Sequence, residues 1–325
     1  MEKGKAAEPA RRTTAAVKAA RRLRTAGWWG LSEGERRALR PLLSAGLEVG
    51  ANFNFRRLGR SPALVRGRTK GGASLWASRE GDGALRSYFS SSLGDVLVAA
   101  PATDSIGSWH ASLEADSTEG LTFVPLEDVR LLSASLGAFN EESGGFDFFW
   151  DRLPAREYEE PEEEAAVAMT PAVADALDSI VEDPAAESLD ALAKRAGREV
   201  ADCAEAVRFV REFPLGWRFS GPRRGEAGLV VVYERLGEDQ FGGIRGAVRG
   251  VPYCVLEGWG REDGGSVYFA ELVVPAAALV ETCEYIRRAS SAWGGAFSSG
   301  FYETKQRRRF VPSWSARGGK AAATR

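Results

Sequence analysis

The middle of the chain contains two stretches that decide the fold, Thr170-Pro-Ala-Val-Ala-Asp-Ala-Leu-Asp-Ser-Ile-Val-Glu182 and Ser188-Leu-Asp-Ala-Leu-Ala-Lys-Arg-Ala-Gly197. Thr170 is a good N-cap and Pro171 suits the first helical position, while Ser188 and Gly197 begin and end a second, shorter helix. A third run spans about residues 199–213. It has apolar residues three or four positions apart, at Val200, Cys203, Val207 and Val210. This spacing predicts three consecutive amphipathic helices.

Two strands are expected to follow, Trp217–Phe219 and Leu229–Tyr233, joined by a segment with Arg223 and Arg224. Three helices followed by a hairpin resemble the winged helix-turn-helix superfamily over about residues 170–236. Ala193 and Gly197 stand at that family's small-residue positions, where close helix crossing and a tight turn are needed. The resemblance implies a wing with the two arginines at its tip and a third helix that enters the DNA major groove. A plain three-helix packing unit is the alternative.

The exposed side of the third helix is expected to be acidic. Four of its seven charged residues are Asp or Glu, in the set Arg198, Glu199, Asp202, Glu205, Arg208, Arg211 and Glu212. A phosphate backbone repels such a surface, and the helix offers no Asn, Gln, Ser or Thr to read base edges. The sequence therefore favours a winged-helix fold that contacts protein.

The rest of the chain divides by composition. An acidic stretch with six Glu between residues 157 and 164 has no apolar face and predicts a solvated linker. We predict an α+β fold with mixed antiparallel strands before the linker and a β-β-β-α lobe at the end. The expected parts are a basic tail or helix (1–26), an N-terminal α+β domain (27–156), the linker (157–169), the winged-helix-like module (170–236), a C-terminal α+β domain (237–314) and a basic tail (315–325). No internal repeat is detectable.

Several further elements are expected from local patterns. Ser32 and Glu35 form a capping box. Residues 108–114 read as a strand, and Pro125 is expected to open a helix that runs through Ala138. In the last domain, residues 244–248, 253–258 and 267–274 read as strands, and a helix is expected to run from Pro275 to Ser290.

Positive charge gathers at both ends of a chain whose net charge is −2. The first 24 residues hold eight Lys or Arg and two Glu, and residues 303–325 hold seven and one. Basic segments of this kind contact nucleic acid or acidic proteins, although mobile, solvated termini are the alternative. The candidate anion-binding residues are Arg223 and Arg224 in the wing and, near the C-terminus, Lys305, Arg307, Arg308 and Arg309.

The chain carries no recognisable catalytic, metal or cofactor motif. Its one histidine, His110, would need a partner for acid–base chemistry, and a structural or surface role is the alternative. Its three cysteines form no Cys-x-x-Cys pair, so a reducing, cytoplasmic setting is expected. The apolar runs are too short to span a membrane. We therefore expect no catalytic residues, no metal and no cofactor.

Three classes of function remain open from the sequence. The favoured hypothesis is a non-enzymatic protein-interaction or assembly component that works with a protein partner or as a homo-oligomer. The first alternative is a nucleic-acid-binding regulator that uses the wing and the basic termini. The second is an enzyme whose site is assembled by folding and leaves no local motif.

Overall fold

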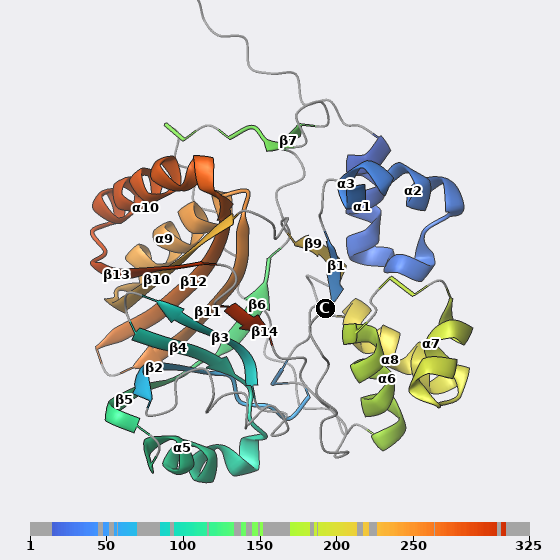
Figure 1. Ribbon diagram of the computed structural model, residues 1–325, viewed down its shortest axis with the longest axis horizontal. Helices are drawn as coiled ribbons and strands as arrows, with labels where there is room; N and C mark the ends of the chain where they lie inside the picture. Colours follow the sequence, from blue (N-terminus) through green and yellow to red (C-terminus); the bar gives the residue numbers. More distant parts are fainter. Residues whose placement is uncertain are drawn as a thin grey trace, which may run out of the picture.

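We describe a computed structural model of the chain. It covers residues 15–44, 48–51, 55–56, 58–69, 85–91, 94–115, 117–132, 138–140, 145–148, 150–151, 170–182, 185–186, 188–212, 217–220, 226–262, 264–303 and 307–309. Two sheets lie face to face, and a separate helical lobe lies beside them (Figure 1). The predicted α+β class with antiparallel sheets is confirmed.

The C-terminal half builds a β-α-β-β-α-β unit. Its elements are β10 (Glu226–Leu236), α9 (Glu238–Gly250), β11 (Cys254–Glu262), β12 (Gly265–Pro275), η5 (Ala276–Ala278), α10 (Leu279–Trp293) and β13 (Phe297–Glu303). In space the four strands run in the order β13-β10-β12-β11, and all neighbours are antiparallel. The first and third strands therefore form the centre of the sheet, where both faces are covered.

The N-terminal half repeats this strand order. Its elements are β2 (Ala63–Thr69), β3 (Leu85–Ser91), β4 (Gly94–Ala99), η3 (Thr103–Ser105), α5 (Ile106–Ala115) and β5 (Ser117–Pro125). The spatial order is β5-β2-β4-β3, again fourth-first-third-second, and α5 precedes the last strand as α10 does in the other half. The expectation of no repeat was thus wrong for the architecture, because topology is duplicated where sequence similarity is not detectable.

Each half also supplies a fifth strand to the sheet of the other half. β6 (Asp128–Leu131) follows β5 and pairs with β11, and β14 (Arg307–Arg309) follows β13 and pairs with β3. Both additions are antiparallel and join the second strand of the receiving unit. The two halves are therefore related like the subunits of a dimer that exchange their last strands.

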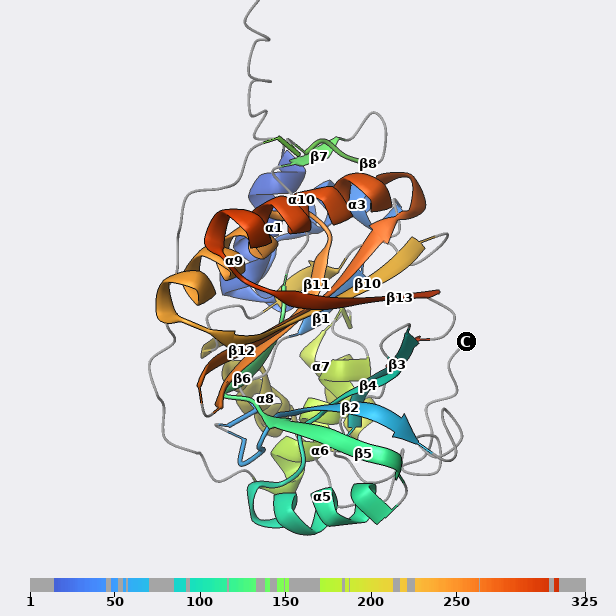
Figure 2. The same cartoon turned by 90° about the vertical axis from the view of Figure 1, so that its left-hand side faces the viewer.

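Apolar side chains fill the space between the two sheets. Leu64, Val96 and Val98 of one sheet meet Val230 and Phe269 of the other, and all five are fully buried or nearly so. The helices lie on the outer faces, with α9 and α10 on one sheet and α5 on the other (Figure 2). Burial of aliphatic residues on both faces of the central strands accounts for their near-continuous apolar sequences.

The chain passes from one sheet to the other at a tight corner between β5 and β6. The Glu127 amide donates to the Trp259 carbonyl oxygen at 2.7 Å, which fixes the corner on β11. A Cβ atom on Gly260 would lie 2.2 Å from the Pro125 carbonyl oxygen, so only glycine allows this approach. Gly260 is therefore a requirement for the strand exchange.

The helical lobe combines segments from both halves around one core. It contains α1 (Ala15–Ala26), η1 (Trp28–Gly30), α2 (Glu33–Ala38), α3 (Arg40–Ser44), α6 (Pro171–Glu182), α7 (Leu189–Ala196) and α8 (Val200–Glu212). The Trp29 indole N–H donates to the Ala186 carbonyl oxygen at 2.8 Å. β1 (Glu48–Ala51) pairs with β9 (Trp217–Ser220). The strands β7 (Phe139–Asn140) and β8 (Gly145–Phe146) pair with each other in a short two-stranded sheet that is separate from both large sheets.

Most helix ends in this lobe were predictable. The capping box of Ser32 and Glu35 is present, and the Ser188 hydroxyl accepts from the Ala191 amide at 3.1 Å. Gly197 ends α7 in the left-handed conformation. The three helices expected between residues 170 and 213 are confirmed, and their assignment to the winged-helix superfamily stays a prediction.

The predicted wing hairpin is wrong. β9 pairs with β1, and β10 lies between β12 and β13 in the C-terminal sheet, so the two strands do not pair with each other. The run Leu229–Tyr233 is almost entirely apolar because it forms the centre of a sheet, where both faces are buried. Local spacing favoured a hairpin, but long-range pairing determines the fold here.

Three other element predictions are wrong for related reasons. Residues 108–114 lie in helix α5, where Trp109 and Leu113 share the buried face. Residues 244–248 lie in helix α9, so the C-terminal lobe is β-α-β-β-α-β and not β-β-β-α. The predicted helix from Pro125 to Ala138 contains strand β6, whose pairing with β11 overrides a helix-like spacing of apolar residues.

Replacing Gly260 with Ala should destabilise the protein by about 3 kcal/mol, because the added methyl group forces the Pro125 carbonyl away from β11. Urea denaturation measures the change. Gly107→Ala is the matched control, since Gly107 lies in α5 with no atom near its Cβ position, and it should be neutral or stabilising by up to about 1 kcal/mol. Equal stability of both variants would contradict the proposed constraint.

Candidate functional site

A row of charged side chains lies on the face of the C-terminal sheet that α9 covers. Glu257 and Trp259 are two residues apart on β11 and therefore share this face. The register of β6 places Arg130 opposite Glu257 and Asp128 opposite Trp259. The strand donated by the N-terminal half thus completes a polar cluster of the C-terminal half.

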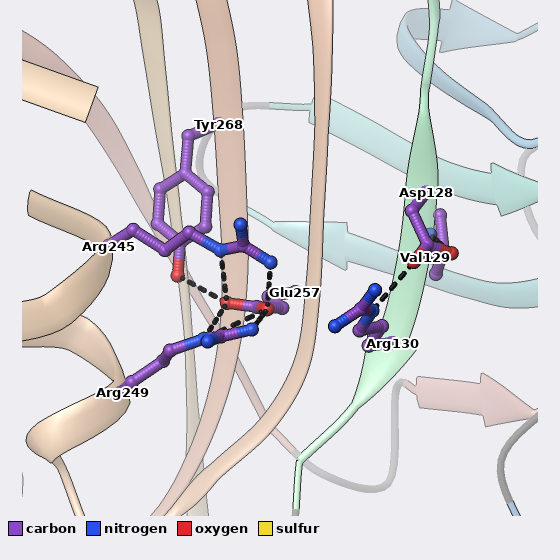
Figure 3. A network of polar contacts seen from close by, with 7 residues as sticks. All are labelled: Asp128, Val129, Arg130, Arg245, Arg249, Glu257 and Tyr268. Carbon is purple, nitrogen blue, oxygen red and sulfur yellow. Dashed lines mark hydrogen bonds and ion pairs between the residues drawn. The ribbon is translucent and has the colours of Figure 1, made fainter. Parts of the chain in front are cut away.

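Glu257 is the centre of this cluster (Figure 3). Arg245 and Arg249 are one turn apart on α9, and both reach down to its carboxylate. The Arg245 Nη2 and Arg249 Nη2 atoms lie 2.9 and 2.6 Å from Glu257 Oε1. The Tyr268 hydroxyl donates to Oε2 at 3.1 Å. The side chains of Arg245 and Glu257 are fully buried, whereas a quarter of the Arg249 side chain is exposed.

The pKa of Glu257 reflects two opposing causes. Burial alone would raise it, but the charges and hydrogen bonds of Arg245 and Arg249 outweigh burial and lower the pKa to about 2. The carboxylate is therefore ionised at neutral pH. Asp128 differs, because burial raises the pKa of its carboxyl even though Arg130 donates to it at 2.6 Å.

Trp259 joins this network to the rest of the site. The Arg245 guanidinium lies 3.6 Å from the centroid of the indole ring, and that of Arg130 lies 5.0 Å away. Arg245 also lies 5.7 Å from the ring of Phe241. Cation–π contacts of buried guanidinium groups fix both partners, so the network holds the two aromatic rings in place.

A pocket of about 500 Å³ adjoins these two aromatic rings. We call it the hairpin pocket, because the turn between β11 and β12 forms one side of it. The start of α9 and the β5–β6 corner form the others. It is lined by Glu127, Leu236, Gly237, Glu238, Phe241, Trp259, Gly260, Arg261, Glu262, Gly265 and Ser266.

Two unusual backbone conformations meet at the rim of this pocket. Arg235, with φ of 55°, is a non-glycine residue in the left-handed region, and it lies in a register shift of β10. Gly265 has φ of 146°, and a Cβ atom there would lie 2.8 Å from the Arg235 carbonyl carbon. Strain of this kind persists only where the surroundings enforce it, and it is commonest at functional sites.

The charges around the pocket are mainly negative. Glu127, Glu238 and Glu262 line it together with a single guanidinium, that of Arg261. The Arg261 Nε atom lies 3.2 Å from Glu127 Oε1, so this carboxylate is held in place. The N-terminus of α9 is not a free anion site, because Gln240 accepts from the Gly237 amide and the first turn holds Glu238 and Asp239.

The candidate residues named from the sequence do not gather at this pocket. Arg223, Arg224 and Lys305 lie outside the described residues. Arg307–Arg309 form β14, in register with Phe89, Tyr88 and Ser87 of β3 on the other sheet. His110 lies on α5, stacked on Phe123 with ring centroids 4.2 Å apart.

His110 has one carboxylate within reach. Its Nε2 atom lies 3.4 Å from Glu114 Oε1, four residues further along the helix. Neither residue lines the hairpin pocket. The pair therefore lies apart from the hairpin pocket, and the role of His110 stays a prediction.

Sequence reasoning missed the arginines and Glu257. Residues 244–248 read as a strand, and in a strand Arg245 and Arg249 gain no common helical face. In a helix their spacing of four puts them one above the other. The spacing of four between these two arginines, in a run that begins with Gly237-Glu238, is the signal that could have found them.

The described residues give no support to a metal site or to a helix that spans a membrane. No group of three or more His, Cys, Asp or Glu residues there could hold a metal ion. No helix among those residues is long and apolar enough to span a membrane. Cys203 and Cys283 are free thiols.

Comparison with known proteins gives weak likenesses only. No family model and no curated protein matches the chain. One similar solved structure is that of the siroheme decarboxylase NirDL, with 13% identity and a TM-score of 0.48, covering 91% of this chain and 94% of that one. Another is NirDL in complex with an iron-uroporphyrin III analogue, with 12% identity and a TM-score of 0.47, covering 88% and 86%. Likenesses this remote assign no residue, substrate or cofactor to this chain.

The favoured hypothesis of a non-enzymatic interaction or assembly component is nevertheless contradicted, because both of these structures are of an enzyme. The physical reason for the error is that absence of a local motif says little about catalysis. Side chains distant in sequence meet only after folding, as Arg130, Arg245 and Glu257 do here.

Replacing Glu257 with Gln should cost about 3–5 kcal/mol of stability at neutral pH, because the buried Arg245 and the partly exposed Arg249 lose their counter-charge. The ionised Glu257 stabilises the fold above its ordinary pKa of 4.5. This contribution, about 3 kcal/mol, should fade as the pH falls from 4.5 toward 2. Urea denaturation at several pH values measures both effects.

The control for this variant is Glu281→Gln, an exposed position on α10. It should keep wild-type stability at neutral pH. The difference between wild type and Glu257→Gln should shrink in acid, and a difference independent of pH would contradict the assignment of a depressed pKa to Glu257.

Replacing Arg235 with Gly should stabilise the protein by up to about 1 kcal/mol, because glycine adopts a positive φ without strain. Arg287→Gly on α10 is the matched control and should destabilise by about 1 kcal/mol, since its backbone is helical. Thermal and urea unfolding measure both. A destabilised Arg235→Gly variant would mean that contacts of the arginine side chain stabilise the fold by more than its strained backbone destabilises it.

Proposed function

We propose that this chain is an enzyme that binds a small substrate in the hairpin pocket. The observation that carries the proposal is a cavity of about 500 Å³ lined by Phe241 and Trp259. The buried ion pair of Arg245 and Glu257 lies behind these rings and holds them in place. Cavities of this size take small organic molecules, and rigid walls fix their orientation. The strongly lowered pKa of Glu257 behind the wall and the strained rim beside it support the same location.

The lining favours a substrate with a basic group. Three carboxylates face one guanidinium, so an ammonium or amidinium group would be attracted and a carboxylate repelled. Phe241 and Trp259 favour an apolar or aromatic body next to that group. The expected substrate is therefore a small organic cation.

Carboxylates are also the groups that can accept a proton in this pocket, because arginine stays protonated in proteins. Glu127 is the candidate general base. It is half-buried and held by Arg261, whereas Glu238 and Glu262 are exposed. A fixed carboxylate beside a bound ammonium group could take a proton from it or from a neighbouring carbon atom.

Siroheme, named in the titles of the similar structures, is not the substrate favoured by this pocket. Siroheme carries several carboxylates, which the acidic lining would repel. DNA is not favoured either. Glu199, directly before α8, and Glu205 on α8 are both exposed, and Arg198 is bound to Asp175 of α6.

The cytoplasmic setting expected from the sequence remains part of this proposal. The free thiols of Cys203 and Cys283 fit a reducing compartment. A protein partner or a second copy of the chain, expected from the sequence, stays a prediction.

Binding of 2-phenylethylamine and 3-phenylpropionate tests the charge assignment, because the two probes share a ring and differ in charge. Calorimetry should show at least about tenfold tighter binding of the amine, as one charge-assisted hydrogen bond would give. Glu127→Gln should lose about tenfold in affinity for the amine, and Glu281→Gln should lose none. Equal affinities for both probes, or tighter binding of the acid, would contradict the proposal.

Turnover is tested separately with a panel of primary amines, with siroheme as a further compound, by mass spectrometry. A change in mass of an amine that is lost in Glu127→Gln supports an enzyme of this class. Binding without any change in mass would support a ligand-binding site in the hairpin pocket and contradict the assignment as an enzyme. Turnover of siroheme would overturn the assignment of the substrate to this pocket.

A further inference from the structure

β13 is an end strand of the C-terminal sheet and has a regular, uncharged edge. Among the described strands only β10 pairs with it, and the register runs without a shift from Phe297 to Glu303. The residues from 297 to 302 include neither a charged residue nor a proline. Native sheets normally place charges, prolines or bulges on an open edge, because these features keep further strands from pairing there.

The equivalent edge of the N-terminal sheet has such features. β5 takes the place in that sheet that β13 has in the other. It ends at Pro125, and its pairing with β2 is interrupted by two register shifts, one on each side of Arg68. Proline and irregular pairing both hinder the addition of a strand. The regular edge of β13 is therefore a property of that strand and does not follow from the duplicated architecture.

α10 covers the face of the sheet beside this edge, and Figure 2 shows α10 and β13 together at the front. The Tyr233 hydroxyl of β10 lies 2.8 Å from the Ser290 hydroxyl of α10, and the Tyr233 ring centroid lies 5.3 Å from that of Phe297. Phe301 is four residues after Phe297 on the strand and therefore lies on the same face. Phe297 packs against the core of the sheet, whereas 47% of Phe301 is exposed.

A second exposed apolar side chain lies at the same end of the sheet. Val280 is in the first turn of α10 and is 72% exposed. Glu226 and Ala227, at the start of β10, pair with the last residues of β12 and β13, and α10 follows β12 after η5. Of the large apolar side chains that the structure describes, Val200 alone is also exposed. Exposed apolar surface is thus concentrated at this edge, as at protein interfaces.

The charges on α10 are divided along its length. Glu281 and Glu284 stand in its first half and are exposed, and Arg287 and Arg288 follow in its second half. Two such helices lying side by side in opposite directions bring the acidic half of each next to the basic half of the other. The charge pattern of α10 is therefore complementary to itself about a two-fold axis.

We propose that β13 is a dimer interface, at which it pairs antiparallel with β13 of a second copy of the chain. Pairing about a two-fold axis at Gly300 places Phe301 of each copy opposite Ser299 of the other. The two C-terminal sheets then form one continuous sheet, with the two α10 helices side by side in opposite directions on its face. A second copy is the partner that this edge fits, because an interface of this symmetry joins each surface to itself.

This interface is separate from the hairpin pocket and does not depend on the proposed function. In the sheet, β10 and β12 stand between β13 and β11, the strand on which the pocket is built. None of the residues that line the pocket comes from β13 or α10. Failure of either proposal would leave the other intact.

Sedimentation equilibrium of the full chain tests the interface and should show a reversible dimer. The variant S299K/F301K should raise the dissociation constant about tenfold or more, because lysine on an edge strand opposes pairing. The variant G120K/T122K adds the same charge at exposed positions of β5 and should stay within about twofold of wild type. A wild-type chain that stays monomeric, or a dimer that S299K/F301K does not weaken, would overturn the proposal.

A second pair of variants leaves β13 unchanged and decides the question if S299K/F301K does not fold. The variant E281K/E284K makes both halves of α10 basic, and R287E/R288E makes both halves acidic. Each alone should dimerise about tenfold more weakly than wild type, whereas an equimolar mixture should form a heterodimer about as tight as the wild-type dimer. The proposal fails if the mixture associates no better than either variant alone.

Discussion

The pairing of β6 with β11 is the interaction on which the rest of this structure depends. It brings a strand of the N-terminal half to the edge of the C-terminal sheet and sets Arg130 opposite Glu257. It also puts Glu127 at the hairpin pocket and requires the glycine at position 260, where the chain turns against β11. Without this pairing the sheet would end at β11, and the buried arginines would face a different environment.

The buried ion network is better explained by specificity than by stability. Two fully buried charges lose so much solvation that apolar residues of similar size are often as stable. The network does, however, penalise errors of register. A slip of β6 by one residue would turn Arg130 and Asp128 to the other face of the sheet, away from Glu257. Charge pairing between β6 and β11 therefore specifies the register of the two strands. Backbone hydrogen bonds alone do not, because they can form in more than one register.

Local signals in the sequence predicted the helical lobe well. The caps at Ser32, Ser188 and Gly197 are formed within a few residues, so no distant contact is needed to recognise them. The same reasoning failed for α9. Four glycines in thirteen residues weaken its helical signal, and one of them is explained only by a partner far away, since a Cβ on Gly243 would lie 2.1 Å from the Trp293 ring.

The candidate site was beyond sequence reasoning for a similar reason. Arg130, Arg245 and Glu257 come from a strand, a helix and another strand, and their meeting depends on an exchange between halves that show no detectable sequence repeat. Both strands of the predicted wing exist, but each pairs with other strands than the prediction assumed. β9 and β10 pair with residues thirty or more positions away, and single-sequence patterns carry little information about such pairings.

Fusion of two similar units in one chain explains how their sites could diverge. In a symmetric homodimer any substitution appears twice, so a charge that suits one site must be tolerated at the other. Here the units differ freely. In the helical lobe, α1, α2 and α3 precede β1, and α6, α7 and α8 precede its partner β9. The last helix before the strand is five residues long in the first set, α3, and thirteen in the second, α8. The exchanged strands differ as well, one balanced in charge and one composed of arginine. The duplicated frame thus fixes where each exchanged strand lies, while the side chains on it are free to serve different chemistry.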